Sequence, residues 1–245
     1  ATIDATTNEL TVTVEMYYTD IQTAGTNHYL NVGILQDNIE GTQTGAQSYN
    51  PSAILPNGNY LHQHAFRGYI NTGGTSGDMF DATQSGVITR TYIYTLPSKI
   101  GNVRVNLQDL KIFAFVGPGK NSATTSEILT AGEVTPVIEN IPVATGHMEG
   151  ITNSFNIGCN ATGTIVPEVE IYNTGNEITS LTLTATINGG TATTFNWTGS
   201  IPTFSSELIT IDNIAEFVPA STYNSVVIAI TEVNGGSGQI ASTFS

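Results

Sequence analysis

The sequence predicts an all-β chain made of two tandem β-sandwich domains, the first jelly-roll-like and the second immunoglobulin-like. Apolar and polar residues alternate with a period of two over many short segments, and no long segment keeps the spacing of an amphipathic helix. Turn-forming pairs such as Asn188-Gly189 and Asn234-Gly235 separate these segments. Short strands spaced by roughly 8–12 residues with such turns between them are typical of β-sandwiches.

The first half of the chain begins with a half-buried strand. Residues 10–18 (LTVTVEMYY) place Leu10, Val12 and Met16 on one face and polar side chains on the other. Further strands are predicted at 28–36, 60–70, 86–95, 101–108 and 110–117. A loop rich in Asn, Gly and Gln fills 37–59, and a short helix or turn is expected at 122–131.

The charge distribution divides the chain in two. All six basic residues lie between Arg67 and Lys120, whereas residues 121–245 contain eleven acids and no Lys or Arg. The formal net charge is therefore −3 for residues 1–120 and −11 for 121–245. The segment 132–168 also interrupts the strand spacing. We therefore predict one domain at 1–140 and a second at 141–245.

The second half repeats the pattern of short strands. They are predicted at 166–172, 178–187, 191–197, 206–211 and 224–233. Asn173-Thr174-Gly175 and the two Asn-Gly pairs supply the turns between them.

The overall composition excludes several classes of protein. With 6 Lys+Arg against 20 Asp+Glu, the chain cannot displace the counterions of nucleic acid, so no nucleic-acid partner is expected. One cysteine, Cys159, rules out a disulfide framework and every CxxC motif. No apolar run reaches the ~20 residues of a spanning helix. Abundant Thr, Asn and Gly with few Lys indicate an exported chain at the cell surface, the outer membrane or outside the cell, and we expect a mature fragment of a longer protein.

The segment YLHQHAFRGY, residues 60–69, is the strongest candidate for a metal site. On one extended strand the side chains of His62 and His64 share a face, about 7 Å apart at a rise of ~3.3–3.4 Å per residue. Imidazole suits zinc or copper, and a third ligand would come from His28 or Asp81. The alternative is that the histidines are structural and hydrogen-bond across strands.

The same segment supplies candidate binding residues. Tyr60 shares the histidine face, and Arg67 is expected to pair with Asp37 or Asp78 as a bidentate fork. Most tyrosines fall in the first half, and tyrosine with Asn and Gln in long loops is typical of a surface that binds sugars or peptides. Residues 37–59 and 71–85 are the loops in which this ligand contact is expected.

Other chemistry has less sequence support. The acids and the Asn and Asp turns of the second half carry the oxygen ligands that calcium prefers, although no Asp-x-Asp-x-Asp spacing occurs. No G-x-S-x-G elbow is present, and Cys159 has no basic neighbour that would form a thiolate. Glu168 and Glu170 share a strand face, and such pairs on a β-surface are most often solvated.

The order of these segments resembles the Omp28-related outer-membrane or surface proteins of Bacteroidota. The resemblance covers roughly residues 8–135 and rests on LTVTVEMYY, HYLNVGILQDNI, LKIFAFV, SEILTAGEV and the YxHxHxxR segment. It implies a β-domain that often follows a thioredoxin-like domain, whose redox role does not carry over because the chain has no CxxC. The second half looks like the immunoglobulin-like modules appended to surface proteins of the same bacteria.

The sequence therefore favours a non-enzymatic cell-surface module for binding, adhesion or assembly, whose partners are other cell-surface proteins or glycans. The alternative is a zinc- or copper-binding protein or metalloenzyme centred on His62 and His64.

Overall fold

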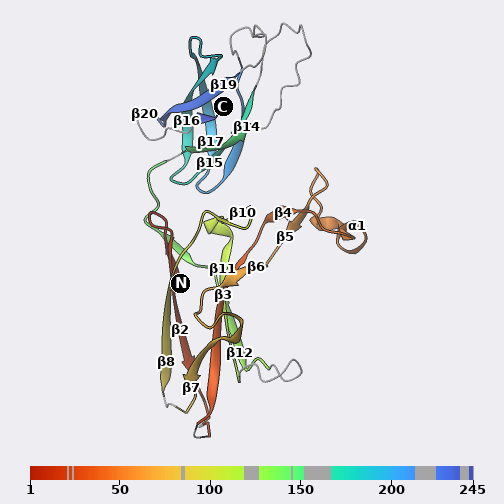
Figure 1. Cartoon of the computed structure of the whole chain (residues 1–245), viewed down its shortest axis with the longest axis vertical. Coiled ribbons are helices and arrows are strands. Elements are labelled where there is room, and N and C mark those ends of the chain that lie inside the picture. The colour runs from red at the N-terminus through yellow and green to blue at the C-terminus, as the bar shows by residue number, and fades with distance from the viewer. Residues whose placement is uncertain are drawn as a thin grey trace. The chain divides into compact units, whose positions relative to one another are not determined.

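The computed structural model describes all residues except 21, 24, 84–85, 119–126, 145, 152–166, 213–224, 238–242 and 245. The chain divides into two compact units, Ala1–Asn140 and Ile141–Ser245 (Figure 1). The described elements are strands apart from one α-helical turn and three short 3-10 turns, so the all-β prediction is confirmed. The finer assignments, jelly-roll-like and immunoglobulin-like, stay predictions.

Unit 1 is built from two main sheets. The first has the strand order β13 (Val137–Glu139), β1 (Thr2–Asp4), β2 (Glu9–Tyr17) and β8 (Val87–Thr95). The second has the order β12 (Thr130–Val134), β11 (Leu110–Gly117), β3 (Asn27–Gln36) and β6 (Ala65–Tyr69), and β7 (Asp78–Asp81) pairs with the other half of β3. All these pairs are antiparallel except β1 with β13.

The core of unit 1 lies between these sheets and follows from the alternation in the sequence. Alternate residues of each strand point to one face of a sheet, and the inward ones here are aliphatic. They include Leu10, Val12, Met16 and Ile88 from the first sheet and Leu30, Val32, Ile34, Leu110, Ile112 and Val116 from the second.

Several predicted elements of unit 1 are wrong. The strand expected at 60–70 is broken into β5 (Tyr60–His62) and β6, because His64 adopts a left-handed backbone with φ of 52°. The strand expected at 101–108 is replaced by a short hairpin, β9 (Lys99–Ile100) and β10 (Val103–Arg104), and the 3-10 turn η3 (Leu107–Asp109). The hairpin turns at Gly101, whose φ is 62°.

A helix or turn is expected at 122–131, and the described residues of this segment, 127–131, form no helix. Residues 130–131 belong to β12, which pairs with β11 and so gains the ladder hydrogen bonds that an isolated turn lacks. Residues 122–126 lie outside the described part of the chain.

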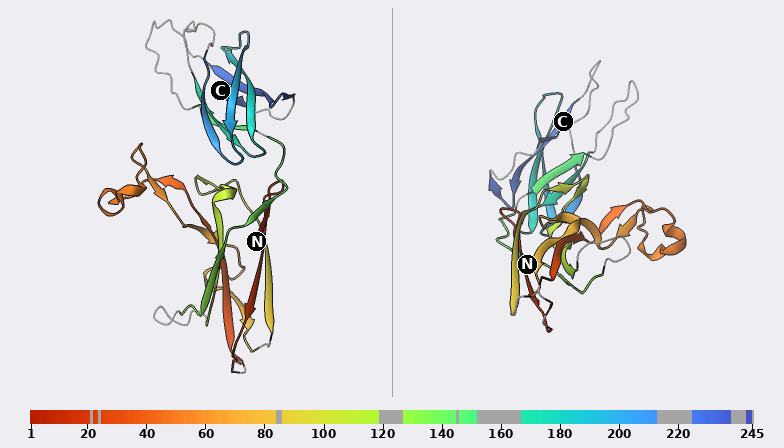
Figure 2. Two further views of the ribbon diagram at one scale, coloured as in Figure 1. Left: turned by 180° about the vertical axis from the view of Figure 1, so that it is seen from behind. Right: turned by 60° about the horizontal axis from the view of Figure 1, so that its bottom comes forward.

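Residues 37–64 form an arm that leaves the second sheet between β3 and β6 (Figures 1 and 2). The arm contains the two-stranded pair β4 (Ile39–Gly41) and β5, with α1 (Ala46–Tyr49) and the 3-10 turn η1 (Pro51–Ala53) between them. A third 3-10 turn, η2 (Gly74–Ser76), lies in the loop before β7. The predicted loop 37–59 therefore has a defined structure.

Unit 2 also contains two antiparallel sheets. One has the order β14 (Gly146–Ile151), β15 (Glu168–Asn173) and β18 (Ser206–Thr210). The other has the order β17 (Thr193–Ile201), β16 (Ile178–Ile187), β19 (Val226–Val233) and β20 (Gly236–Ser237), with β21 (Thr243–Phe244) also on β19. Aliphatic residues such as Val169, Ile171, Leu183 and Ile228 form its core.

The turn predictions of unit 2 are confirmed at both Asn-Gly pairs. All four residues have a positive φ between 50° and 73°, the conformation that tight hairpins require and that Asn and Gly tolerate best. β14 was missed because its sequence, GHMEGI, has no alternating apolar pattern. Cys159 falls outside the described residues. In the part of the chain that the structure describes, no helix is long and apolar enough to cross a membrane.

Candidate functional site: the arm and the aromatic face of unit 1

The two histidines of the HxH segment do not share one strand face. His62 ends β5 inside the arm, whereas His64 lies after the strand break at the base of the arm. The prediction that both imidazoles share a face required one continuous extended strand. The backbone turns at His64, so this prediction is wrong.

His64 belongs to a charged cluster at the base of the arm. Its backbone N–H donates to Asp37 Oδ1 at 2.6 Å, and its Nδ1 lies 3.1 Å from the same oxygen. His64 Nε2 lies 3.6 Å from Glu133 Oε1, and Lys111 Nζ lies 3.2 Å from that oxygen and 3.8 Å from Asp37 Oδ2. The left-handed turn at His64 thus points its backbone and ring at Asp37, and fixes where the arm leaves the sheet.

His62 and Tyr60 face a shallow polar pocket in the arm. Their rings meet edge to face with centroids 4.9 Å apart, and the Tyr60 hydroxyl accepts a hydrogen bond from Asn50 Nδ2 at 3.0 Å. The pocket has a volume of about 460 Å³ and is lined by residues 43–46, 49–50, 53 and 60–63, which include the polar side chains of Gln43, Thr44, Asn50 and Gln63. Tyr49 on α1 is 90% exposed.

Arg67 pairs with neither of the predicted carboxylates. Its Nη2 donates to the carbonyls of Ile100 at 3.1 Å and Val103 at 2.9 Å, so the guanidinium holds the β9–β10 hairpin against β6. Burial lowers the pKa of Arg67, and its Nε is buried without a hydrogen-bond partner. Arg67 is a structural residue of unit 1, and the expected fork with Asp37 or Asp78 is wrong.

Asp78 organises the loop between β6 and β7. It accepts hydrogen bonds from Gly73 N at 2.6 Å and from the Thr72 hydroxyl at 2.8 Å. Burial opposes ionisation of Asp78, but these donors outweigh it and lower its pKa. The pKa of Tyr92 on β8 is raised, mainly because the Tyr92 hydroxyl is buried. The negative charge of Asp78 is the second cause.

Neither candidate third metal ligand lies near the HxH segment. His28 and Asp37 stand at opposite ends of β3, which at ~3.3–3.4 Å per residue separates them by about 30 Å. Asp81 is exposed and accepts from Thr83 at the far end of β7. Among the described residues, no group of three or more His, Cys, Asp and Glu side chains is placed to hold a metal ion. A zinc, copper or calcium site stays a prediction of the sequence alone.

His28 is a buried core residue. It is 5% exposed, accepts from or donates to the Tyr18 hydroxyl through Nδ1 at 2.5 Å, and packs edge to face on Phe80. Burial lowers its pKa below the usual 6.5. The unfolded chain therefore binds a proton at a higher pH than the folded chain does.

We expect the melting temperature of unit 1 to fall as pH drops below about 6.5, because the unfolded His28 is protonated there while the folded one stays neutral. Above that pH the contribution of His28 is complete. Melting curves between pH 8 and pH 5 measure the effect, and His28→Gln is expected to reduce it. The matched variant His62→Gln, in the arm, should retain the wild-type pH dependence. If His28→Gln keeps the wild-type pH dependence of the melting temperature, His28 is not its cause.

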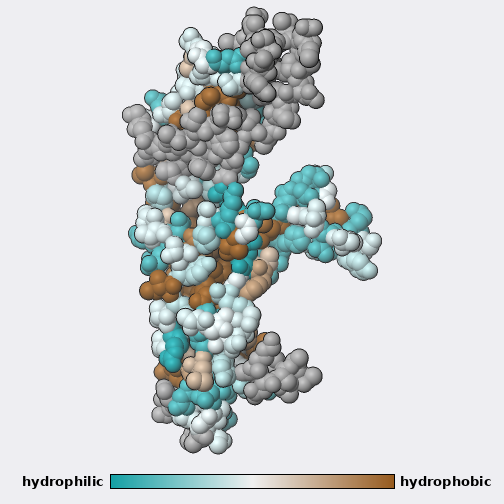
Figure 3. Space-filling view, in the orientation of Figure 1, coloured by the Kyte–Doolittle hydropathy of each residue, from teal (hydrophilic) through white to brown (hydrophobic). Residues whose placement is uncertain are grey.

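The outer side of the second sheet carries an aromatic cluster, which we call the aromatic face and define as Phe66, Tyr69, Phe113 and Phe115. Phe66 contacts Tyr69 with ring centroids 4.9 Å apart, and both lie 6.1 Å from Phe113. Phe113 and Phe115 are parallel within 5° at 6.1 Å. Phe66 is 55% exposed, and hydrophobic residues gather on the body of unit 1 beside the base of the largely hydrophilic arm (Figure 3).

Strand register explains this face. Tyr69 and Phe113 are the partners of Gly33 from the two sides of β3, and Phe115 lies two residues farther along β11. A Cβ atom on Gly33 would lie 2.6 Å from Phe113 Cζ, so the missing side chain allows the Phe113 ring to lie over β3. The charged cluster adjoins the face through Lys111 on β11 and Glu133 opposite Phe113.

Sequence reasoning identified the strand LKIFAFVG but missed its outer face. Phe113 and Phe115 alternate there with Ile112, Ala114 and Val116, so both faces of the strand are apolar. In an all-β chain that lacks helices to cover a sheet, a strand that is apolar on both faces signals an exposed apolar surface.

Comparison with known proteins gives no family. No family model matches the chain, and no curated protein matches it either. Among solved structures it is similar to HBP35 of Porphyromonas gingivalis, with 15% sequence identity and a TM-score of 0.44. The match covers 100% of this chain and 61% of that one, so the chain spans less than two thirds of the length of HBP35. A similarity at this level assigns neither family nor function, and the Omp28-related resemblance stays a prediction.

Proposed function

We propose that the chain is a non-enzymatic binding module of an exported bacterial surface protein and that the aromatic face takes a carbohydrate ligand. The observation that carries the proposal is the platform of four neighbouring rings on the outer side of the second sheet. Two of these rings are parallel, and one is more than half exposed. Isolated exposed apolar side chains are common, but a contiguous aromatic cluster is typical of interaction surfaces.

The chemistry of the face and its surroundings suits a sugar. The C–H faces of a pyranose ring pack on aromatic faces, and its hydroxyl groups need charged or amide partners close by. The charged cluster supplies a carboxylate at Glu133 and an ammonium at Lys111 beside the rings. A cell-surface protein is the alternative ligand of this face.

Cell-surface location rests on composition. An acidic chain with few Lys residues and many Thr, Asn and Gly residues supports export. The acidity also disfavours anionic partners, so neutral or basic glycans are the expected class.

We expect the chain to bind a neutral or amino-sugar glycan on an array, and the Phe66→Ser variant to lose at least about tenfold in affinity, as for a central aromatic contact. Ile93→Ser is the matched control, because Ile93 is 66% exposed on the outer face of the other sheet. Fluorescence anisotropy with the glycan found on the array measures both affinities.

The substitution at Phe66 tests binding and not folding, since a side chain that is 55% exposed contributes little to the core. The melting temperatures of both variants should stay close to that of the wild type. An empty array, or equal losses of affinity in Phe66→Ser and Ile93→Ser, contradicts the proposal. Binding to a surface protein that Phe66→Ser abolishes would assign the face to the alternative ligand.

A further inference from the structure

One edge of β2 is only partly covered. β8 pairs with all of β2 from Glu9 to Tyr17, but on the other edge β1 pairs only with Glu9 to Thr11. No described strand pairs with the remaining part of that edge, residues 12–17. The first sheet therefore lacks a strand alongside half of β2.

The hydrogen-bond pattern identifies the open backbone groups. Leu96 N donates to Asn8 O, and these two residues are opposite each other in the register of β2 and β8. In an antiparallel ladder, bonded residues alternate, so the even-numbered residues of β2 bond to β8. The N–H and C=O groups of Thr13, Glu15 and Tyr17 consequently point to the open edge, and they bond to no described residue.

In the opposite sheet, no described strand pairs with the outer edge of β12. β12 pairs with β11 on one side only, and all five of its residues are exposed. Thr130, Gly132 and Val134 are opposite Val116, Ala114 and Ile112, so they face the sandwich interior. A strand added to the open edge of β2 would lie against these three residues.

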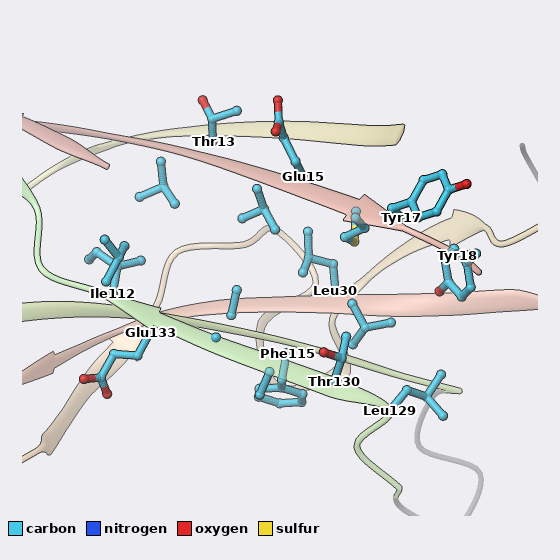
Figure 4. A pocket seen from close by; sticks show the side chains of 18 of the residues that line it. Thr13, Glu15, Tyr17, Tyr18, Leu30, Ile112, Phe115, Leu129, Thr130 and Glu133 are labelled. Carbon is cyan, nitrogen blue, oxygen red and sulfur yellow. The ribbon is translucent and has the colours of Figure 1, made fainter. Parts of the chain in front are cut away.

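A groove of about 590 Å³ lies between the two open edges. Its floor is formed by aliphatic side chains, with Leu30 and Ile112 between the ribbons of the two sheets (Figure 4). Thr13 and Glu15 project from β2 away from this space, and Glu133 projects from the other side (Figure 4). The backbone edge and the apolar floor are thus both available to an incoming segment.

We infer that this groove accepts an extended segment of a partner protein, which adds to β2 as a further antiparallel or parallel strand of the first sheet. The open edge spans Thr13–Tyr17, which fits a strand of about five residues. Strand addition supplies main-chain hydrogen bonds for affinity, while alternate side chains enter the apolar floor and provide specificity. The partner segment therefore has apolar residues at every second position.

Among the described residues, the open edge has no Pro, Lys or bulge, and Glu15 is its one charged side chain. Proteins commonly block exposed edges with Lys, Pro, a bulge or a covering loop. Residues 13–17 of β2 are Thr, Val, Glu, Met and Tyr, and the pairing with β8 shows no bulge there. Such an edge above an apolar groove is the arrangement that strand addition uses.

The acidic residues that line the groove predict which side chains the partner segment carries on its outward-facing side. The groove lining contains Glu15, Asp20 and Glu133 and no Lys or Arg. Glu15 makes no ion pair or hydrogen bond with any residue that the structure describes. A Lys or Arg opposite Glu15 forms a favourable cross-strand pair, so we expect a partner segment that alternates apolar and basic or neutral polar residues.

This inference does not depend on the carbohydrate site. The aromatic face is centred on rings on the outer side of the second sheet, whereas the groove is defined by the β2 edge; Phe115 and Glu133 border both, and Phe66 and Glu15, the residues that the two experiments change, each belong to one of them only. The glycan array tests the first, and a peptide experiment tests the second.

The experiment uses the 245-residue chain and a panel of acetylated nine-residue peptides in which Val alternates with Lys or Thr. Hydrogen exchange followed by NMR is expected to show protection of the Thr13, Glu15 and Tyr17 amides when peptide is added. The even-numbered amides of β2 should be protected with or without peptide. A panel in which Pro replaces the central residue is the matched control and should give no protection.

Two substitutions test the site. Glu15→Pro removes the central N–H of the open edge without removing a bond to β8, and it should weaken binding at least about tenfold. Glu15→Gln should weaken the Lys-containing peptides several-fold and leave the Thr-containing ones unchanged. Glu9→Gln is its control, since the edge at Glu9 is already paired with Asp4 of β1.

Three results would overturn the inference. The first is the absence of protection with every peptide at concentrations up to about 1 mM, which corresponds to negligible affinity. The second is protection of Thr13, Glu15 and Tyr17 without peptide, which would show that another segment of the chain already covers this edge. The third is an equal effect of Glu9→Gln and Glu15→Gln. If Glu15→Pro unfolds unit 1, the Glu15→Gln comparison decides the question.

Discussion

Replacing Asn173 by Leu is expected to lower the free energy of unfolding of unit 2 by about 3–5 kcal/mol, the range for losing a buried hydrogen-bond network. Asn173 ends β15 and is fully buried. Its Nδ2 lies within hydrogen-bond distance of the carbonyls of Asn176 at 2.8 Å, Ile201 at 3.0 Å and Pro202 at 3.2 Å. Its Oδ1 accepts from Gly175 N at 2.9 Å.

The size of the expected effect follows from the partners that remain. Leu has a similar volume but no donor or acceptor, so the backbone groups that face Asn173 would stay buried and unpaired. Each buried polar group without a partner costs about 1–3 kcal/mol. The amide also joins the ends of two sheets, since Ile201 belongs to β17 and Asn173 to β15.

Urea unfolding followed by tryptophan fluorescence measures this effect. The only tryptophan in the chain is Trp197, which packs against the core of unit 2 and therefore reports on that unit. Asn196→Leu is the matched control: Asn196 is exposed on β17, and among the described residues its side chain accepts from the Thr182 hydroxyl alone. The control should change stability by no more than about 0.5 kcal/mol. A similarly small change for Asn173→Leu would show that its hydrogen bonds contribute little.

Replacing Asn71 by Leu is expected to destabilise unit 1 by about 2–4 kcal/mol, again because buried backbone groups lose their partners. Asn71 is 6% exposed. Its Oδ1 accepts from the backbone N–H of Val32 at 2.9 Å, and its Nδ2 donates to Gly74 O at 2.9 Å. Ile70 N donates to Val32 O at 2.9 Å beside it.

Asn71 completes an interrupted ladder. β6 pairs with β3 from Gly33 to Gln36, and β7 pairs with it from Asn27 to Leu30, so Val32 lies in the gap between them. The side-chain amide takes the place of the missing strand residue at Val32. Without it, the buried N–H of a central strand has no acceptor.

Hydrogen exchange at Val32 measures this prediction directly. In Asn71→Leu the Val32 amide should exchange much faster, and thermal unfolding of unit 1 should shift to lower temperature. Asn57→Leu is the control, because Asn57 is exposed in the arm, where it donates to Glu40 and accepts from Asn59 N, far from Val32 in the sequence. It should leave the exchange rate of Val32 unchanged. Slow exchange of Val32 in Asn71→Leu would mean that another acceptor takes over.

Elements with strong alternation were predictable from the sequence. The strands around Val12, Leu30 and Ile112 and the Asn-Gly hairpins of unit 2 lie where the period of two and the turn residues place them. Short elements without that pattern, such as β1 and β14, were missed because their strand conformation is supplied by pairing with distant partners.

The HxH segment shows why local pattern was insufficient for the site. YLHQHAFRGY has the composition of a strand throughout, yet Asp37 binds the His64 backbone and ring from 27 residues away, and the chain turns there. Arg67 likewise binds two carbonyls of a hairpin more than 30 residues later in the chain. Neither contact has a signal within the segment itself.

The sequence by itself determined the all-β class, most of the longer strands and the tight turns, because side-chain alternation and the φ preferences of Asn and Gly act over a few neighbouring residues. Only the tertiary structure decided that His62 and His64 separate, that Phe66 and Phe113 meet on one face, and that no described strand pairs with residues 12–17 of β2 on the edge beside β12. These features depend on register and on which strands become neighbours, and both are set by contacts between residues far apart in the chain.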